Sequence, residues 1–502
     1  MSEVDPAATL LPPEAGDSNG KAESMLRDLR EALDWEAPRG ERSARVEADA
    51  RYLEGDGRLT AVSSPSGDLL YRMDAPLSST SWADGRRAVA IDRTGMPRPL
   101  EGQDLELARL LAAILTGTWL ATGSAVRIES SEADGDVVLV RVDGGRLVAR
   151  LLRDGPLGRP LAFEVESLRG TERFELEYGD GPAPWVPARV RHRLRDIPIS
   201  EYRRTAVAHA PSGAALGLVE PEVSIPRDVS FDASSHAVRA VRANSGQLLV
   251  EAEVAGETGW FVLDTGASAT VVASGWPSRE LPRIGESPLV SAYSVAPAAV
   301  RRASSLRVGP ATIRDLPVVE MDLAFLSEPL GRPVAGIVGY DLFARAFARI
   351  DSAAAEVSLE PPSGAPSAAP WIPFRFESKL PVVEARWEPM GTGDFRIDLG
   401  ASPGVIFHWP VVERHRLLEG RDGEQVPVGS QSLLAASIDD FELGGARSSG
   451  VIALFAQGPG AILGDRYTDG NIGVGILDRY RILLDYRRAR MALLPRPETE
   501  SQ

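Results

Sequence analysis

The sequence predicts a mostly β protein, in which an N-terminal curved antiparallel sheet with helices precedes two similar β units. Three observations support this prediction. Apolar and polar residues alternate with period two in segments such as 163–166 and 174–178, as they do in half-buried antiparallel strands. Segments rich in proline, glycine, alanine and serine divide the chain into parts. Finally, residues 250–268 and 383–402 share one sequence pattern, which indicates an internal repeat.

The composition is that of an acidic globular protein without cysteine. The 502 residues include 55 Lys and Arg against 71 Asp and Glu, a formal net charge of −16. At ~150 residues per domain, this length fits about three domains. The negative charge argues against nucleic acid and against an anionic membrane surface as partners. The lack of cysteine excludes disulfide scaffolds, thiolate nucleophiles and Cys-type zinc sites.

The first part of the chain predicts a tail and a β domain. Residues 1–21 carry acids, prolines and glycines, which is typical of a disordered tail. A domain is expected over 22–210, with a short helix at 22–33, a longer one at 103–121 and antiparallel strands around them. The order of the strands and the turn Trp82-Ala83-Asp84-Gly85 resemble the LolA-like family of envelope proteins. The resemblance implies a half-barrel that can hold an apolar ligand, and an inert or partner-docking domain is the alternative.

The second part of the chain is divided by two linkers. We expect a linker at 211–226, a first lobe at 227–362, a second linker at 363–370, a second lobe at 371–496 and a tail at 497–502. No basic segment followed by an apolar core stands in the first twenty residues, so no signal peptide is visible. The apolar stretch 110–126 contains three Thr, two Gly and a Ser, and it predicts a helix on a core, not a transmembrane segment.

The two lobes repeat a hairpin that ends in an aspartate. The first copy ends in Asp264-Thr265-Gly266-Ala267-Ser268 and the second in Asp398-Leu399-Gly400-Ala401-Ser402. Gly339 and Gly473 each follow their aspartate by 75 residues, and the two aspartates lie 134 residues apart. Two spacings kept over so long a stretch indicate a duplicated unit of ~130 residues.

The repeated motif suits acid–base chemistry. An apolar strand holds the carboxylate on a rigid element, and the glycine lets the backbone turn close to it. The hydroxyl of Ser268 can donate to Asp264 and favour its ionised form. Two such carboxylates brought together share one proton, so that one serves as general base on a water and the other as general acid.

These residues resemble the retropepsin-like and pepsin-like aspartic proteases, with two fused lobes of the acid-protease type in one chain. The resemblance covers about residues 237–496. It implies a catalytic dyad of Asp264 and Asp398 that hydrolyses a peptide or protein substrate without a metal or cofactor. Because both lobes lie in one chain, a monomer should hold the whole site.

The same resemblance implies roles for the neighbours of the aspartates. Thr265 would make the hydroxyl contact that locks the two loops together, and Gly266 and Gly400 would turn the loops. Ser268 and Ser402 would brace the carboxylates. Gly339 and Gly473 would pack beneath the loops. A hairpin flap is expected in each lobe, at 291–296 with Tyr293 over the cleft and, as its rough counterpart, at 426–430.

The second lobe departs from the family pattern. Leu399 stands where the family has Thr or Ser and cannot return the locking contact, which would cost ~1 kcal/mol or more. Asn471 replaces the apolar residue that matches Ile337. A catalytically impaired peptide-binding protein is therefore the alternative to an endopeptidase, and an envelope carrier that uses the N-terminal sheet is a third reading.

Several other features remain open or carry no role. Asp264 or Asp398 could be ordinary turn residues. The five histidines, among them His408 and His415, fit no usual metal site. No nucleophile elbow, phosphate-binding loop or His-Glu-x-x-His motif is present in the sequence. The resemblance favours the cell envelope as location, with the cytoplasm as the alternative.

Overall fold

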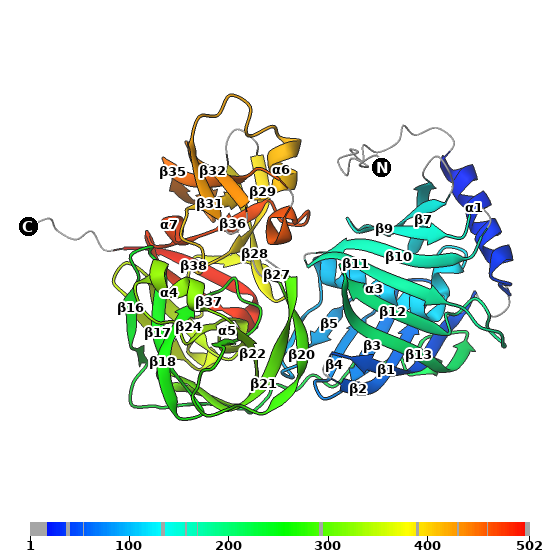
Figure 1. Ribbon diagram of the computed structural model, residues 1–502, viewed down its shortest axis with the longest axis horizontal. Helices are drawn as coiled ribbons and strands as arrows, with labels where there is room; N and C mark the ends of the chain where they lie inside the picture. The colour runs from blue at the N-terminus through cyan, green and yellow to red at the C-terminus, as the bar shows by residue number, and fades with distance from the viewer. Residues whose placement is uncertain are drawn as a thin grey trace, which may run out of the picture.

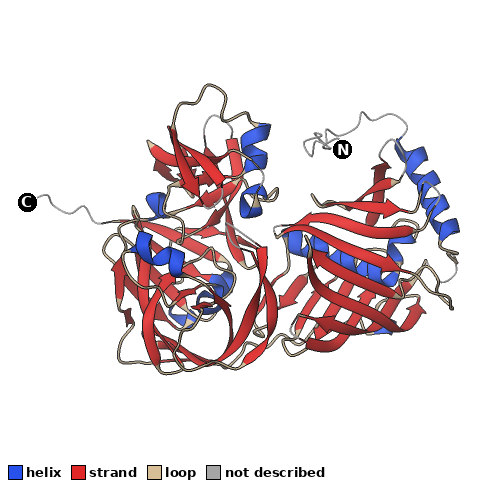
Figure 2. Ribbon diagram, in the orientation of Figure 1, coloured by secondary structure: helices blue, strands red, loops and turns tan. Residues whose placement is uncertain are grey.

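The computed structural model describes residues 18–36, 41–53, 55–131, 136–155, 158–167, 169–290, 295–387, 391–428, 431–458 and 460–496. Most of this part is β-sheet, and short helices lie against the sheets (Figure 2). The prediction of a mostly β fold is confirmed. Figure 1 shows the N-terminal sheet on one side and the two later lobes on the other.

The N-terminal part forms one sheet in which every pairing is antiparallel. Its order is β6-β5-β4-β3-β2-β1-β13-β12-β11-β10-β9-β8-β7, so the first and last strands of the domain, β1 and β13, meet in the middle. The strands are β1 (Ser43–Tyr52), β2 (Gly55–Ser63), β3 (Leu69–Asp74), β4 (Ser79–Ala83), β5 (Ala88–Ile91), β6 (Pro97–Pro99), β7 (Val126–Ser131), β8 (Val137–Val142), β9 (Val148–Arg153), β10 (Pro160–Ser167), β11 (Gly170–Glu177), β12 (Arg189–Leu194) and β13 (Ile197–Ala210).

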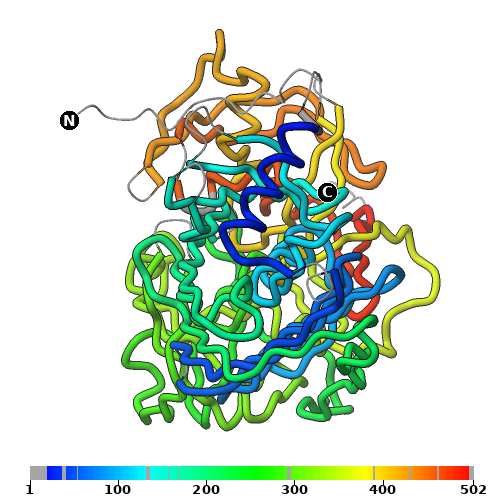
Figure 3. The backbone as a smooth tube through the Cα atoms, turned by 90° about the vertical axis from the view of Figure 1, so that its right-hand side faces the viewer, coloured from blue at the N-terminus to red at the C-terminus, as the bar shows by residue number. Residues whose placement is uncertain are grey.

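In the described part of this domain, helices α1 and α3 accompany the sheet. Helix α3 (Gly102–Thr116) packs its buried residues, among them Leu110 and Ile114, into the core under the strands. It ends earlier than predicted because Gly117 adopts a left-handed conformation, and the 3₁₀ turn η1 (Thr118–Leu120) follows. Helix α1 (Ser18–Ala32) begins inside the segment predicted as tail and lies on the outer side of this domain, away from the lobes (Figures 1 and 3).

Residues 211–226 contain the 3₁₀ turn η2 (Ala214–Leu216) and no strand. The first lobe then forms a nine-stranded sheet. Its strands are β14 (Val229–Phe231), β16 (Ala240–Arg242), β17 (Leu248–Val254), β18 (Glu257–Leu263), β19 (Val271–Ala273), β20 (Arg283–Val290), β21 (Val295–Val308), β22 (Ala311–Met321) and β23 (Gly336–Val338), and its helices are α4 (Ala324–Leu330) and α5 (Tyr340–Phe343).

The second lobe forms a ten-stranded sheet. Its strands are β27 (Arg375–Glu377), β28 (Leu380–Trp387), β29 (Gly391–Ile397), β30 (Val405–Phe407), β31 (Glu424–Val428), β32 (Gln431–Ile438), β33 (Phe441–Leu443), β34 (Ala446–Ser448), β35 (Val451–Ala456) and β36 (Gly470–Ile472). Helices α6 (Trp409–Arg414) and α7 (Val474–Leu477), with the turn η4 (Ala461–Gly464), complete it.

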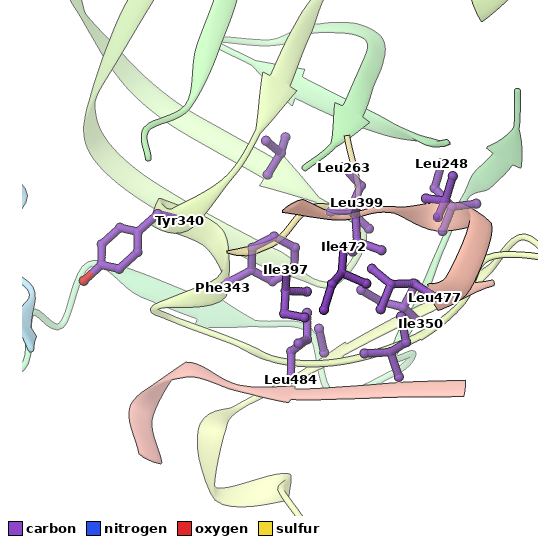
Figure 4. Packing of buried hydrophobic residues seen from close by; sticks show 14 of the residues in the cluster. Leu248, Leu263, Tyr340, Phe343, Ile350, Ile397, Leu399, Ile472, Leu477 and Leu484 are labelled. Atoms are coloured by element: carbon purple, nitrogen blue, oxygen red, sulfur yellow. The ribbon is translucent and has the colours of Figure 1, made fainter. Parts of the chain in front are cut away.

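A six-stranded sheet joins the two lobes, with strand order β15-β25-β24-β37-β38-β26. Each lobe supplies strands to it, and they meet where β24 pairs with β37 at Ala348 and Leu484. The strands are β15 (Ala237–Val238), β24 (Phe347–Asp351), β25 (Glu356–Glu360), β26 (Trp371–Pro373), β37 (Tyr480–Asp485) and β38 (Arg490–Pro495), with the 3₁₀ turns η3 (Pro362–Gly364) and η5 (Tyr486–Arg488) between them. One hydrophobic core runs through both lobes, and Figure 4 shows Leu263, Leu399 and Leu484 in it.

The N-terminal domain docks on the lobes through the start of α3. The Glu101 carboxylate accepts from the Phe376 amide at 3.0 Å, and Glu377 accepts from the Gln103 amide at 3.1 Å. Tyr467 of the second lobe packs into the core of the N-terminal domain. The Leu53 carbonyl accepts from the amide of Glu286, on β20 of the first lobe, at 3.2 Å. The domain therefore contacts both lobes.

Candidate active site

The two predicted aspartates occupy matching positions in the two lobes. Strand β18 runs parallel to β23 and delivers Asp264, whose amide donates to the Val338 carbonyl at 2.9 Å. Strand β29 runs parallel to β36 and delivers Asp398, whose amide donates to the Ile472 carbonyl, also at 2.9 Å. Each carboxylate thus follows directly on a buried strand that a parallel neighbour holds in place.

The loops after these strands bring the carboxyl groups together. The Gly266 amide donates to Oδ1 of Asp264 at 2.7 Å. The Gly400 amide lies 3.0 Å from Oδ1 of Asp398 and 3.2 Å from Oδ1 of Asp264, so one N–H faces both side chains. The two carboxyl groups lie close enough for each to affect the pKa of the other. The sequence-predicted pair is therefore in direct contact.

Glycine is required at both turns beside the pair. A Cβ on Gly266 would lie 2.7 Å from Oδ1 of Asp398, and a Cβ on Gly400 would lie 2.6 Å from Cγ of Asp264. Real Cβ atoms essentially never approach other atoms so closely. Each glycine therefore leaves room for the carboxylate of the opposite lobe, a close approach that any side chain would block.

Gly339 and Gly473 lie against the same loops. A Cβ on Gly339 would meet the Ala267 carbonyl at 2.3 Å, and one on Gly473 would meet the Pro403 carbonyl at 2.2 Å. The next residues are bonded to the loops, since the Tyr340 amide donates to the Ala267 carbonyl and the Val474 amide to the Ala401 carbonyl, each at 2.9 Å. The structure thus places both glycines where the sequence predicted them.

Thr265 joins the two lobes beneath the pair. Its hydroxyl donates to the Ile397 carbonyl at 2.7 Å and accepts from the Leu399 amide at 3.0 Å. Leu399 is 2% exposed and packs in the common core. Its side chain has no polar atom, so the locking contact exists in one direction only, as the sequence predicted.

Burial and proximity raise the pKa values of both carboxyl groups. For Asp264, removal from water and the neighbouring Asp398 hold the pKa well above its usual range. Removal from water also raises the pKa of Asp398, but hydrogen bonds from Asn471, Asp264 and Gly400 oppose the rise. The pair therefore keeps a shared proton to a higher pH than a single exposed carboxyl group would.

The expectation for the two serines is wrong. Ser268 and Ser402 are exposed, and within the described ranges neither hydroxyl bonds to a carboxylate of the pair. The carbonyl of the alanine before each serine accepts from the Tyr340 or the Val474 amide, and the serine that follows is exposed to solvent. The braces are instead the Gly266 and Gly400 amides and the side chain of Asn471, whose Nδ2 donates to Oδ2 of Asp398 at 2.8 Å.

Three further residues near the pair were not predicted. His408 is fully buried, and its Nε2 lies 3.1 Å from Oδ1 of Asn471. Gln247 reaches from the first lobe to the Gly400 carbonyl at 3.0 Å. Thr468 touches the other side of the His408 ring. The one signal available in the sequence was Asn471 itself, a polar residue at an apolar position of the repeat.

A long hairpin stands at each predicted flap. In the first lobe β20 pairs with β21 from Arg283 and Arg301 to Val290 and Val295, and its tip, with Tyr293, lies outside the described residues. In the second lobe β31 pairs with β32, and the tip at 429–430 also lies outside them. The position of Tyr293 over the cleft stays a prediction.

Among the described residues no group of three or more His, Cys, Asp or Glu side chains is arranged to hold a metal ion. In the same part of the chain no helix is both long and apolar enough to cross a membrane.

Comparisons with known proteins agree with the sequence in the first lobe. Residues 250–342 match the family model described as aspartyl protease, and this segment contains Asp264 and Gly339. Among solved structures, the chain is similar to the aspartic proteinase from Irpex lacteus at 14% identity and a TM-score of 0.36, over 53% of this chain and 99% of that one. None of the curated proteins matches the chain. The resemblance to aspartic proteases is confirmed, and the resemblance to LolA-like proteins stays a prediction.

Proposed function

We propose that the protein is an aspartic endopeptidase that hydrolyses peptide bonds with Asp264 and Asp398. The observation that carries this proposal is the contact of two carboxyl groups, one from each lobe, around the single N–H of Gly400. Two aspartates that served only as turn residues of separate hairpins would not be expected to face one N–H together. A half-buried pair that shares one proton is the machinery for metal-free hydrolysis of an amide.

We assign the role of base to Asp398, whose Oδ2 accepts from Asn471, and the role of acid to Asp264. Asp398, the ionised member, takes a proton from a water that lies between the carboxylates, and this water attacks the carbonyl carbon of the substrate. Asp264, the protonated member, donates to the carbonyl oxygen as negative charge develops on it. An extended peptide under the two hairpins would add its backbone hydrogen bonds as a strand does.

The test is cleavage of a diverse peptide library between pH 3 and pH 8. Wild-type protein should cut peptides within this range, and Asp264→Asn and Asp398→Asn should each lower the rate by at least ~10³-fold, because the acid or the base is lost. Ser268→Ala is the control and should keep wild-type activity. Cleavage that persists in both aspartate variants would contradict the proposal.

Binding without hydrolysis is the second candidate, and Leu399 favours it. The one-sided contact between Thr265 and the second lobe removes one of the bonds that hold the pair in register. Peptides that bind wild-type protein at micromolar concentration but stay intact at every pH would support this candidate. Cleavage that depends on both aspartates would exclude it.

A further inference from the structure

The two carboxylates of the pair have different surroundings. Oδ2 of Asp398 accepts from Nδ2 of Asn471 at 2.8 Å. The matching residue of the first lobe is Ile337. Ile337 pairs with Val262 on the strand that leads to Asp264, just as Asn471 pairs with Arg396 on the strand that leads to Asp398. A side chain without polar atoms cannot donate to Asp264. The second lobe therefore has a donor that the first lobe lacks.

The Asn471 amide lies between Asp398 and His408. Its oxygen faces Nε2 of His408 at 3.1 Å, and its Nδ2 faces Oδ2 of Asp398. With its oxygen held there, the amide can present only its NH₂ group to Asp398. Asn471 is 7% exposed and His408 fully buried, so water does not compete for these bonds.

Thr468 contacts the other nitrogen of the His408 ring. This nitrogen, Nδ1, lies 3.2 Å from the Thr468 hydroxyl and 3.0 Å from the Thr468 carbonyl. Thr468 also bonds to the carboxylate of Asp465, which pairs with Arg396. Burial, with Arg396 next, lowers the pKa of His408 to about 4. The ring is therefore neutral at neutral pH.

We infer that Asn471, oriented by His408, is a positioning residue that makes Asp398 the ionised member of the pair and leaves the proton on Asp264. The inference rests on the proposed function for its catalytic meaning. A hydrogen bond to the charged form of a carboxyl group favours that form. Because the donor stands on one side only, it breaks the symmetry that two similar lobes would otherwise give the pair. The charged or titratable groups facing Asp398 are Asp264, Arg396 and Tyr486, and those facing His408 are Arg396 and Asp465.

The effect can be measured through stability, without any activity. Asn471→Leu removes the donor to Asp398, and this part of the stabilisation is lost only where Asp398 is ionised. Loss of the contact with His408 adds a part that is the same for both charge states of Asp398. The melting temperature should therefore fall increasingly below that of wild type as the pH rises from 3 to 7. Ile337→Leu is the control, because it introduces leucine at the matching position of the first lobe. Its melting temperature should differ from that of wild type by the same amount at every pH.

A second variant covers the case in which Asn471→Leu does not fold. Asn471→Asp has nearly the same shape and can still bond to His408, but it places a third carboxyl group beside the pair. At pH 3 its melting temperature should match wild type, and it should fall below wild type as the pH rises. A difference from wild type that does not depend on pH, in either variant, would overturn the inference.

Activity provides the separate readout for catalysis. If wild-type protein cleaves peptides, the acid limb of kcat/KM should move up by about one pH unit in Asn471→Leu, a tenfold change in proton concentration. An unmoved acid limb would overturn the inference. Absence of cleavage by wild type would count against the proposed function alone, because the melting series tests the charge on Asp398 independently.

Discussion

The Thr265 hydroxyl of the first lobe donates to the Ile397 carbonyl of the second lobe at 2.7 Å, and it accepts from the Leu399 amide at 3.0 Å. Thr265 is 1% exposed, so its removal would leave a buried N–H and C=O without partners. We expect Thr265→Val to lower the free energy of unfolding by ~2 kcal/mol. Chemical denaturation measures this loss. Ser268→Ala, which changes an exposed hydroxyl two positions from Gly266, should stay within ~0.5 kcal/mol of wild type, and an equal loss in both would contradict the assignment.

Leu399→Thr tests whether the missing half of the contact can be restored. The new hydroxyl could reach the Thr265 amide and the Leu263 carbonyl, the counterparts of the atoms that Thr265 itself contacts. Loss of buried apolar volume costs ~0.8 kcal/mol per methylene, against a net gain of ~1 kcal/mol for a hydrogen bond. We therefore expect Leu399→Thr to be less stable than wild type, by ~1 kcal/mol.

Leu399→Val is the matched control, because valine has the shape of threonine without the hydroxyl. Both variants lose the same packing, so Leu399→Thr should be the more stable of the two by ~1 kcal/mol in thermal or chemical denaturation. If Leu399→Val is the more stable variant, the hydroxyl has found no partner, and the second lobe has lost the geometry for the contact.

Gly266→Ala should separate the two carboxyl groups. A Cβ at this position would lie 2.7 Å from Oδ1 of Asp398, so either the loop or the carboxylate must move. We expect a fall in peptide cleavage of at least ~100-fold, because a displacement of ~1 Å has this effect on catalysis. Gly85→Ala is the control, since a Cβ there meets no atom within 4 Å. Cleavage at the wild-type rate by Gly266→Ala would show that the pair is not the reacting group.

The sequence predicted those parts of the site that local pattern determines. The hairpin, the aspartate and the glycine after it lie within a few residues of each other. The internal repeat then identifies the corresponding residues of the second lobe. The role of Ser268 was predicted wrongly, because a shift of one residue along a tight loop changes which side chain faces the carboxylate. Ala267, which precedes it, has its carbonyl held by the Tyr340 amide, and no local pattern contains that contact.

Contacts between distant residues could not be predicted. His408 and Asn471 are 63 residues apart, and they meet because β30 and β36 are neighbours in the sheet of the second lobe. The junction between Glu377 and the start of α3 joins residues 274 apart. Such pairings depend on the register of strands and on domain docking, neither of which appears in a single sequence.

Glu377 makes the domain junction sensitive to pH. Its side chain is 2% exposed, accepts from the Gln103 amide at 3.1 Å and pairs with Arg375. Removal from water, followed by the nearby Asp104, raises the pKa of Glu377 to about 7 from 4.5. A carboxyl group with a raised folded-state pKa destabilises the folded protein at high pH, because the unfolded chain ionises more easily.

The direction of the pKa shift of Glu377 determines the pH range in which stability changes. The folded protein should lose stability as the pH rises from about 4.5 to about 7, by at most ~3.4 kcal/mol at 1.36 kcal/mol per pH unit, and the loss should level off above that range. Glu377→Gln should remove this part of the slope when melting temperatures are measured from pH 4.5 to pH 8. Ser378→Ala, which removes a bond to Asp104 at the same junction, carries no titratable group and should lower the curve without flattening it. A slope that is unchanged in Glu377→Gln would mean that the carboxyl group is not held in the buried, amide-bonded position that the junction gives it.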